Sequence, residues 1–193
     1  MSEAQPLHGM VATMSRNVEI KARIESVEAL ALRVARLADG EAVTIYQDDT
    51  FFTCAAARLK LRDFGDGHGE LIYYERADRA GPKESFYLRS RTSDPGALRE
   101  SLSRAYGVAG RVNKCRTLFL IGRTRVHLDR VQGLGDFIEL EVVLGHDEPV
   151  AAGVREARAL MTQLGIDEAR LVTGAYVDLQ ADVRAAASSA RSR

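Results

Sequence analysis

Apolar and acidic residues alternate in the most informative stretch of the sequence, FIELEVV at residues 137–143. Successive side chains of a β-strand point to opposite faces, so Glu139 and Glu141 share one face and Ile138, Leu140 and Val142 share the other. The stretch therefore predicts a strand with one acidic face and one apolar face.

The stretch RLKLR at residues 58–62 has the same alternation with the opposite charge, because Arg58, Lys60 and Arg62 share a face. Further charged pairs at this spacing occur in other predicted strands: Glu19 with Lys21, Lys114 with Arg116, and Arg125 with His127 and Asp129. For one strand alone, a solvated outer face is the more common explanation. A purely basic strand beside a purely acidic strand is unusual for a surface, which normally mixes both signs.

If these charged faces all point into one barrel, basic rows stand opposite acidic rows. Unpaired buried charges are costly, so such an interior is expected to hold water, metal ions and an anionic ligand. Arg can bind two phosphate oxygens at once, and carboxylates suit Mg²⁺ or Mn²⁺. The charge pattern therefore favours a binding site for phosphates and divalent ions.

The remaining periodicity predicts an alternation of strands and helices. Strands are expected at residues 17–24, 43–53, 58–64, 70–76, 85–92, 111–121, 125–131 and 137–144. Helices are expected at residues 26–38, 95–106 and 150–164, followed by a helical turn at 167–172 and a last segment at 175–179. Short links between strands favour antiparallel pairing, and seven or eight strands could close into a barrel with helices outside.

The 193 residues fit one domain, for which we expect residues 16–180, with a mobile tail at 1–15 and a disordered tail at 181–193. The 27 basic and 27 acidic residues cancel, which argues against general attraction to nucleic acid or a membrane surface. No apolar run approaches the roughly 20 residues of a membrane span, and no signal peptide is legible, so a cytoplasmic protein is expected.

Four segments resemble the CYTH superfamily, the triphosphate tunnel metalloenzymes, and look closest to its CyaB-like class IV adenylyl cyclase branch. They are RNVEIKARI at 16–24, RLKLR at 58–62, TRVHLDRVQGLGDFIELE at 124–141 and GAYVDL at 174–179. The resemblance implies an α+β fold, a closed eight-stranded antiparallel β-barrel with helices packed outside. It also implies a small-molecule triphosphate substrate, Mg²⁺ or Mn²⁺, and a homodimer.

Site residues follow from the same resemblance, position by position. The implied metal ligands are Glu19, Asp129, Glu139 and Glu141. The implied triphosphate-binding residues are Lys21, Lys60, Arg62, Arg76, Lys114, Arg116 and Arg125. Glu19, Lys21 and Asp129 are the implied catalytic residues, and Lys83 is the alternative to Arg76 as a phosphate-binding cation.

Three positions leave alternatives open. The family signature ExExK begins here with Asn17, so one negative charge is missing and the number of metal ions is open. His127 is either an acid/base group or a structural side chain, and the structural role is favoured. Tyr176 resembles a C-terminal tyrosine of the family, or packs the last segment against the rim.

The resemblance leads to a class IV adenylyl-cyclase-like enzyme, which converts ATP into cyclic AMP and pyrophosphate. The alternative enzyme is a hydrolase of tripolyphosphate, thiamine triphosphate or nucleoside triphosphates. A non-catalytic polyphosphate- or nucleotide-binding protein is the alternative from another class.

Overall fold

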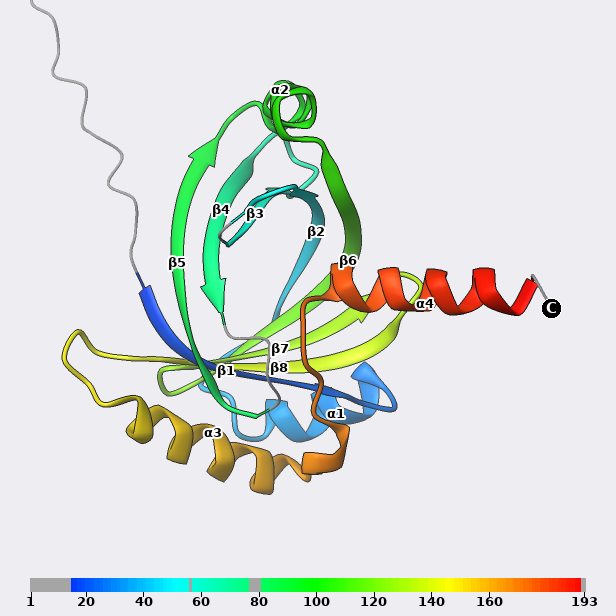
Figure 1. The fold of residues 1–193 in the computed structure, drawn as a ribbon. Coiled ribbons are helices and arrows are strands. Elements are labelled where there is room, and N and C mark those ends of the chain that lie inside the picture. The colour runs from blue at the N-terminus through cyan, green and yellow to red at the C-terminus, as the bar shows by residue number, and fades with distance from the viewer. Residues whose placement is uncertain (1–14, 56, 77–80, 192–193) are drawn as a thin grey trace, which may run out of the picture.

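The computed structural model describes residues 15–55, 57–76 and 81–191, and these form a closed barrel of eight strands with four α-helices outside (Figure 1). The strands are β1 (Ser15–Arg23), β2 (Val43–Phe52), β3 (Arg58–Asp63), β4 (Gly69–Arg76), β5 (Lys83–Thr92), β6 (Val108–Ile121), β7 (Thr124–Val131) and β8 (Gly135–Val143). They follow the order β1-β5-β4-β3-β2-β6-β7-β8 around the barrel, and all neighbours are antiparallel. The predicted eight-stranded antiparallel barrel is confirmed.

Local sequence signals fix the helices α1 (Val27–Ala35), α2 (Pro95–Tyr106), α3 (Val150–Leu164) and α4 (Tyr176–Arg191). The Ser26 hydroxyl accepts a hydrogen bond from the Ala29 amide at the start of α1, and the Asp94 carboxylate does the same for Ala97 at the start of α2. Helix α3 ends at Gly165, whose φ of 65° is left-handed and suits glycine. A short 3₁₀ turn, η1 (Glu168–Arg170), links α3 to the last segment.

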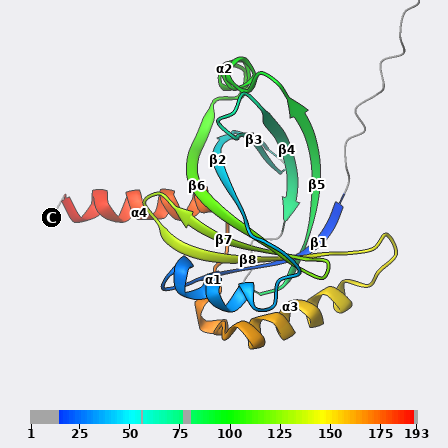
Figure 2. The same cartoon turned by 180° about the vertical axis from the view of Figure 1, so that it is seen from behind.

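The main apolar core lies outside the barrel wall. Helices α1 and α3 cover the outer faces of β1, β7 and β8 (Figure 2), where Ile20, Leu128 and Leu140 are fully buried or nearly so. Each such side chain contributes about 1.5–3 kcal/mol to folding. Helix α3 lies close to β1 at Gly153, where an added Cβ atom would be 2.8 Å from the Val18 side chain. Apolar residues of these strands thus face the helices, and their charged neighbours face the barrel interior.

The C-terminal segment differs from the sequence prediction. Disorder is predicted for residues 181–193, whereas α4 continues to Arg191 with its side chains from 181 to 190 exposed. The segment has no apolar face to bury, but alanine has the highest helix propensity, and this local preference extends the helix. The predicted N-terminal tail lies outside the described residues except for Ser15, which begins β1. The domain limits stay a prediction.

Among the described helices, none is long and apolar enough to cross a lipid bilayer.

Candidate functional site

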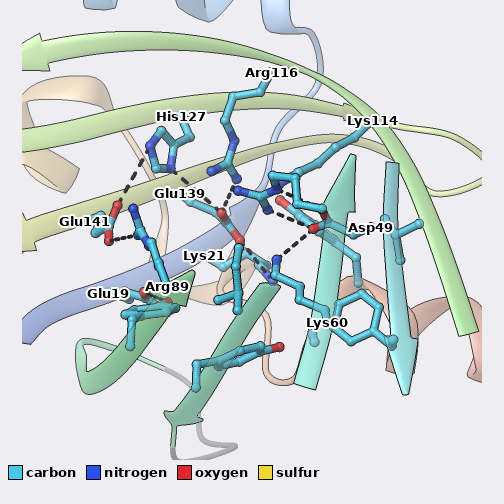
Figure 3. Close-up of a pocket in the computed structure, with 18 residues that line it drawn as sticks. Glu19, Lys21, Asp49, Lys60, Arg89, Lys114, Arg116, His127, Glu139 and Glu141 are labelled. Atoms are coloured by element: carbon cyan, nitrogen blue, oxygen red, sulfur yellow. Dashed lines mark hydrogen bonds and ion pairs between the residues drawn. The ribbon is translucent and has the colours of Figure 1, made fainter. Parts of the chain in front are cut away.

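Charged side chains from most of the strands line one cavity inside the barrel (Figure 3). They are Glu19, Lys21, Asp49, Lys60, Arg62, Arg89, Lys114, Arg116, Glu139 and Glu141, and the imidazole of His127 lies among them. The aromatic rings of Phe51, Tyr74, Tyr87 and Tyr176 complete the wall. The alternation read from the sequence therefore does bring basic and acidic rows to a shared interior.

Most of the predicted site residues meet in this cavity, and two whose side chains the structure describes, Asp129 and Arg125, do not line it. Asp129 is fully buried behind the wall, in contact with residues that line the cavity. Arg125 lies beside the acidic end, where its guanidinium is 3.0 Å from the Glu141 carboxylate. The backbone of Arg76 pairs with Ser85, while its side chain lies outside the described residues. Lys83, the alternative cation, is buried on β5 opposite Glu19. The roles of all these residues stay predictions.

Asp49 organises the first basic cluster. Its carboxylate accepts hydrogen bonds from Arg62 Nε at 2.7 Å, Arg62 Nη2 at 2.8 Å and Lys60 Nζ at 2.7 Å. Burial works against the charge on Asp49, but Arg62 and then Lys60 outweigh it and hold the pKa of Asp49 well below its usual value. Burial and the neighbouring Arg62 lower the pKa of Lys60 to about 7.

Asp129 organises the second basic cluster. Its carboxylate accepts hydrogen bonds from Arg116 Nε and Nη2, both at 2.6 Å, and from Lys114 Nζ at 2.7 Å. The Tyr176 hydroxyl donates a further hydrogen bond of 3.0 Å to Asp129. Arg116 and Lys114 hold the pKa of Asp129 well below its usual value despite burial. Asp129 thus holds Arg116 and Lys114 in place, and its role as a metal ligand stays a prediction.

The acidic side of the cavity is divided into two environments. Glu139 lies 3.1 Å from Lys21 Nζ and also accepts a hydrogen bond from Arg116, and these cations keep its pKa low against the effect of burial. Glu141 stands opposite Glu19 in the pairing of β1 with β8. Burial and then the charge of Glu19 raise the pKa of Glu141. Two carboxylates therefore stand side by side here, and Arg125 and Arg89 offset part of the charge of Glu141.

Asn17 adjoins this acidic pair from the same face of β1 as Glu19. It is fully buried, and its amide nitrogen donates a hydrogen bond to Glu141. Its amide oxygen is buried without a hydrogen-bond partner, which is unusual for a polar atom. Asn17 thus supports Glu141 without adding a charge, and it offers a further oxygen beside the two carboxylates.

These oxygens fit a divalent cation that is shared with a ligand. Within the described residues, no group of three His, Cys, Asp or Glu side chains converges to hold an ion. Mg²⁺ is usually bound by one or two carboxylates, water and substrate phosphates, so a full protein cage is not needed. The charge between Glu19 and Glu141 and the unpartnered oxygen of Asn17 are the features that such an ion would satisfy.

The profile of the CYTH domain family matches residues 15–176 of this chain. The chain belongs to the CYTH domain family. No curated protein matches its sequence.

Solved structures share the CYTH fold at low sequence identity. The PH1012 protein of Pyrococcus horikoshii superposes with a TM-score of 0.76 and 24% identity, over 84% of this chain and 98% of that one. A candidate adenylate cyclase of Vibrio parahaemolyticus has a TM-score of 0.68 and 22% identity, over 86% and 98%. A candidate adenylyl cyclase of Hippeastrum, HpAC1, described as having a dominant triphosphatase activity, has a TM-score of 0.57 and 18% identity, over 82% and 90%.

His127 lies between the two glutamates of the CYTH cavity. Its Nδ1 is 3.9 Å from Glu139 and its Nε2 is 3.9 Å from Glu141. Burial and then Arg116 hold the pKa of His127 well below its usual value, so the imidazole is neutral at neutral pH. A neutral ring can donate one hydrogen bond and accept another, which fits a role in orienting groups next to the carboxylates.

Two charged residues of the CYTH cavity are absent from the sequence predictions. Asp49 belongs to the alternating row Gln47, Asp49 and Phe51, but the adjacent Asp48 hides which of the two aspartates faces inward. Arg89 and Arg91 are two residues apart on β5 and therefore share a face. Arg89 lies 3.8 Å from Glu141 in the structure. The spacing of alternate residues along the strand shows which side chains share a face with Asp49 and with Arg89. Which of the two faces points into the barrel depends on the register with the neighbouring strands.

Proposed function

We propose that this CYTH domain is a metal-dependent enzyme acting on a small-molecule triphosphate, with a reaction of the class IV adenylyl cyclase type. CYTH enzymes act on triphosphates and use divalent metals. One observation carries the proposal. Two Lys–Arg clusters, each held by an aspartate, share one cavity with the acidic pair Glu19 and Glu141. Cations there suit phosphate oxygens, and the carboxylates suit a metal ion.

The basic residues supply most of the catalysis in this proposal. Lys60, Arg62, Lys114 and Arg116 contact the non-reacting phosphates and stabilise the negative charge that grows on the leaving group. Asp49 and Asp129 already hold these side chains in place, so the side chains lose little conformational entropy when the substrate binds. Lys21, held 3.1 Å from Glu139, adds a cation at the acidic side.

The acidic residues would hold the metal ion and orient the nucleophile. Glu19 and Glu141, with Glu139 nearby, would hold Mg²⁺ or Mn²⁺ together with phosphate oxygens. When bound, such an ion neutralises phosphate charge and lowers the pKa of a coordinated nucleophile. In the cyclase reaction the ribose 3′-oxygen bonds to the α-phosphorus, loses its proton, and pyrophosphate leaves.

Hydrolysis of the terminal phosphate is the second candidate. The same cations would hold the chain of phosphates, while water attacks the γ-phosphorus and a diphosphate leaves. The Hippeastrum structure, described as having a dominant triphosphatase activity, supports keeping this candidate beside the cyclase. The position of the substrate along the cavity decides between the two reactions.

One product assay tests the proposal. The purified protein is incubated with Mg²⁺ or Mn²⁺ and ATP, tripolyphosphate or thiamine triphosphate, with a chelator as control. Metal-dependent formation of cyclic AMP and pyrophosphate supports the cyclase, and orthophosphate without cyclic AMP supports the hydrolase. Tight binding of all three compounds without turnover would contradict both and identify a non-catalytic binding protein.

A further inference from the structure

Arg89 differs from Arg62 and Arg116, the other described arginines that line the CYTH cavity. Arg62 and Arg116 each direct Nε and Nη2 at one aspartate, so this edge of both guanidinium groups is occupied. Within the residues that the structure describes, Nε of Arg89 is buried without a hydrogen-bond partner. Its Nη2 is 3.8 Å from Glu141, which is too long for a hydrogen bond. The same edge of Arg89 is therefore open to a ligand.

The open edge of Arg89 suits a phosphate. A buried donor normally has an acceptor, and the Nε–H and Nη2–H bonds of arginine are parallel, so that they match two oxygens of one phosphate. The guanidinium carbon lies 5.4 Å from the centre of the Tyr87 ring, which supports the side chain from one side. Figure 3 shows Arg89 next to Glu141 and Glu19, at the acidic side of the cavity. A phosphate at this side would supply the acceptor that Arg89 lacks.

Glu141 faces protein donors with both of its carboxylate oxygens. Oε1 accepts a hydrogen bond from Asn17 and faces Arg89, while Oε2 lies 3.0 Å from Nη1 of Arg125. Sites of phosphoryl transfer often hold two divalent ions, and each ion needs its own oxygen ligands. Here Asn17 brings no charge, and Glu139 is paired with Lys21. The acidic side therefore offers carboxylate ligands for one ion rather than two.

The balance of charge leads to the same number of ions. Of the charged side chains that line the cavity, six are cationic and four are acidic, which leaves an excess of two positive charges. A triphosphate ester carries about four negative charges at neutral pH. One divalent ion together with this excess balances the triphosphate, whereas a second ion would leave positive charge uncompensated in a largely buried site, which is costly.

We propose that Arg89 binds a phosphate of the substrate through its Nε–Nη2 edge and takes the place of a second divalent ion beside Glu141. This inference rests on the proposed function, because it requires the triphosphate to lie in the CYTH cavity. A guanidinium at this point neutralises charge on the bound phosphate, which is one task of the second ion in a two-metal site. The enzyme would therefore use one divalent ion per substrate.

Substitution of Arg89 tests the contact with phosphate. Binding of a methylene-bridged tripolyphosphate, which resists cleavage, is measured by calorimetry in the presence of Mg²⁺. Arg89→Gln should weaken this binding at least about tenfold, because charge-assisted hydrogen bonds are lost. Arg89→Lys should recover only part of the affinity, because an ammonium group cannot form two parallel hydrogen bonds.

Arg91→Gln is the matched control, since Arg91 is an exposed residue of the same strand and does not line the cavity. It should bind the analogue as the wild type does. Melting temperatures show whether each variant is folded. Equal affinity of Arg89→Gln and Arg91→Gln would overturn the inference. If Arg89→Gln does not fold, full affinity of Arg89→Lys would overturn it.

The number of bound ions tests the replacement of the second ion. Mn²⁺ is titrated into the complex with the analogue and followed by electron paramagnetic resonance. The wild type should bind one ion per chain and give the spectrum of an isolated ion. Asn17→Asp combined with Arg89→Gln adds a carboxylate and removes the guanidinium, so this variant should bind a second ion and give the spectrum of a spin-coupled pair. Two ions in the wild type, or one ion in the double variant, would overturn the replacement.

Failure of the underlying function gives a different result. If the tripolyphosphate analogue does not bind the wild-type protein at all, the triphosphate proposal itself fails. If the analogue binds and Arg62→Ala weakens it, while Arg89→Gln has no effect, only the inference about Arg89 fails.

Discussion

Asp49 and Asp129 accept equivalent hydrogen bonds in two separate clusters: Oδ1 from an arginine Nε, and Oδ2 from the Nη2 of that arginine and from a lysine Nζ. In both clusters the lysine and the arginine are two residues apart on one strand, and the aspartate lies on the adjacent strand. In each cluster one carboxylate holds a lysine and an arginine in fixed directions, and in the second cluster Arg116 also donates a hydrogen bond to Glu139.

Asp49→Asn should destabilise the protein and increase its response to phosphate. The change leaves Lys60 and Arg62 close together without their shared anion, and breaking a buried pair of this kind costs about 3–5 kcal/mol. A bound triphosphate analogue supplies the missing negative charge. We expect the melting temperature to fall, and the analogue to raise it more in the variant than in the wild type.

Asp48→Asn is the matched control for this prediction. Asp48 pairs with Arg111, whose side chain is half exposed, so its loss should cost under about 1 kcal/mol. The same analogue should stabilise Asp48→Asn and the wild type equally. A similar loss of stability in both variants would show that Asp49 does not organise the cluster.

Metal binding should depend on the triphosphate. The part of the chain that the structure describes offers the carboxylates of Glu19 and Glu141 rather than a complete cage, so phosphate oxygens must supply further ligands. Electron paramagnetic resonance of Mn²⁺ should show at least about tenfold tighter binding in the presence of a tripolyphosphate analogue. Glu141→Gln should abolish this enhancement and the metal-dependent turnover.

Glu84→Gln serves as the comparison, since Glu84 forms its ion pair with Arg16 on the outside of the barrel. It should bind Mn²⁺ as the wild type does. Tight Mn²⁺ binding without any phosphate, or unaltered turnover in Glu141→Gln, would count against the metal assignment.

Asn17→Asp should make stability depend on the metal. The new carboxylate would stand beside Glu141, whose pKa is already raised by burial and by Glu19. An acid with a raised folded pKa costs stability as the pH rises above its unfolded value, so the loss should appear at pH 8 and vanish in acid. Mn²⁺ should restore the melting temperature. Asn113→Asp is the control. Asn113 is partly exposed and donates a hydrogen bond to Gln132, so this variant should show no such rescue.

Lys60→Arg should change the pH dependence of phosphate binding. Burial and Arg62 lower the pKa of Lys60 to about 7, so its charge is lost as the pH rises through that value. Arg stays protonated throughout. Between pH 6 and pH 8 the affinity of the variant relative to the wild type should rise up to about tenfold. The ligand titrates identically in both measurements, so its own pH dependence cancels in the ratio of the two affinities. Parallel profiles of affinity against pH for the variant and the wild type would contradict the prediction.

Much of the fold was legible in the sequence because its strands alternate so regularly. Strand β8, with Glu139 and Glu141 on one face and Leu140 on the other, could be read locally. The order of strands around the barrel could not, because the pairing of β1 with β5 joins segments that are distant in sequence. Helix α4 is not predicted, because the lack of an apolar face in residues 181–193 indicates disorder, whereas the alanine propensity that extends the helix acts locally.

The cavity residues divide in the same way. Lys60 and Arg62 were predicted because their alternation with Leu59 and Leu61 fixes their common face. Asp49 was missed because Asp48 and Asp49 are adjacent, and only the pairing of Asp49 with Arg62 across β2 and β3 shows which one faces inward. The partners of Asp129 likewise depend on the register of β6 and β7, which no local pattern contains.

Strand β1 pairs with β5 on one side and with β8 on the other, so the first described strand completes the ring with the last described strand. During synthesis, β1 leaves the ribosome long before β8 exists. Its unpaired edge and its charged inner row must remain in water until then, which exposes the nascent chain to association with other strands. Closure between such distant segments also slows folding, because the entropy of the long loop is lost before the final contacts form.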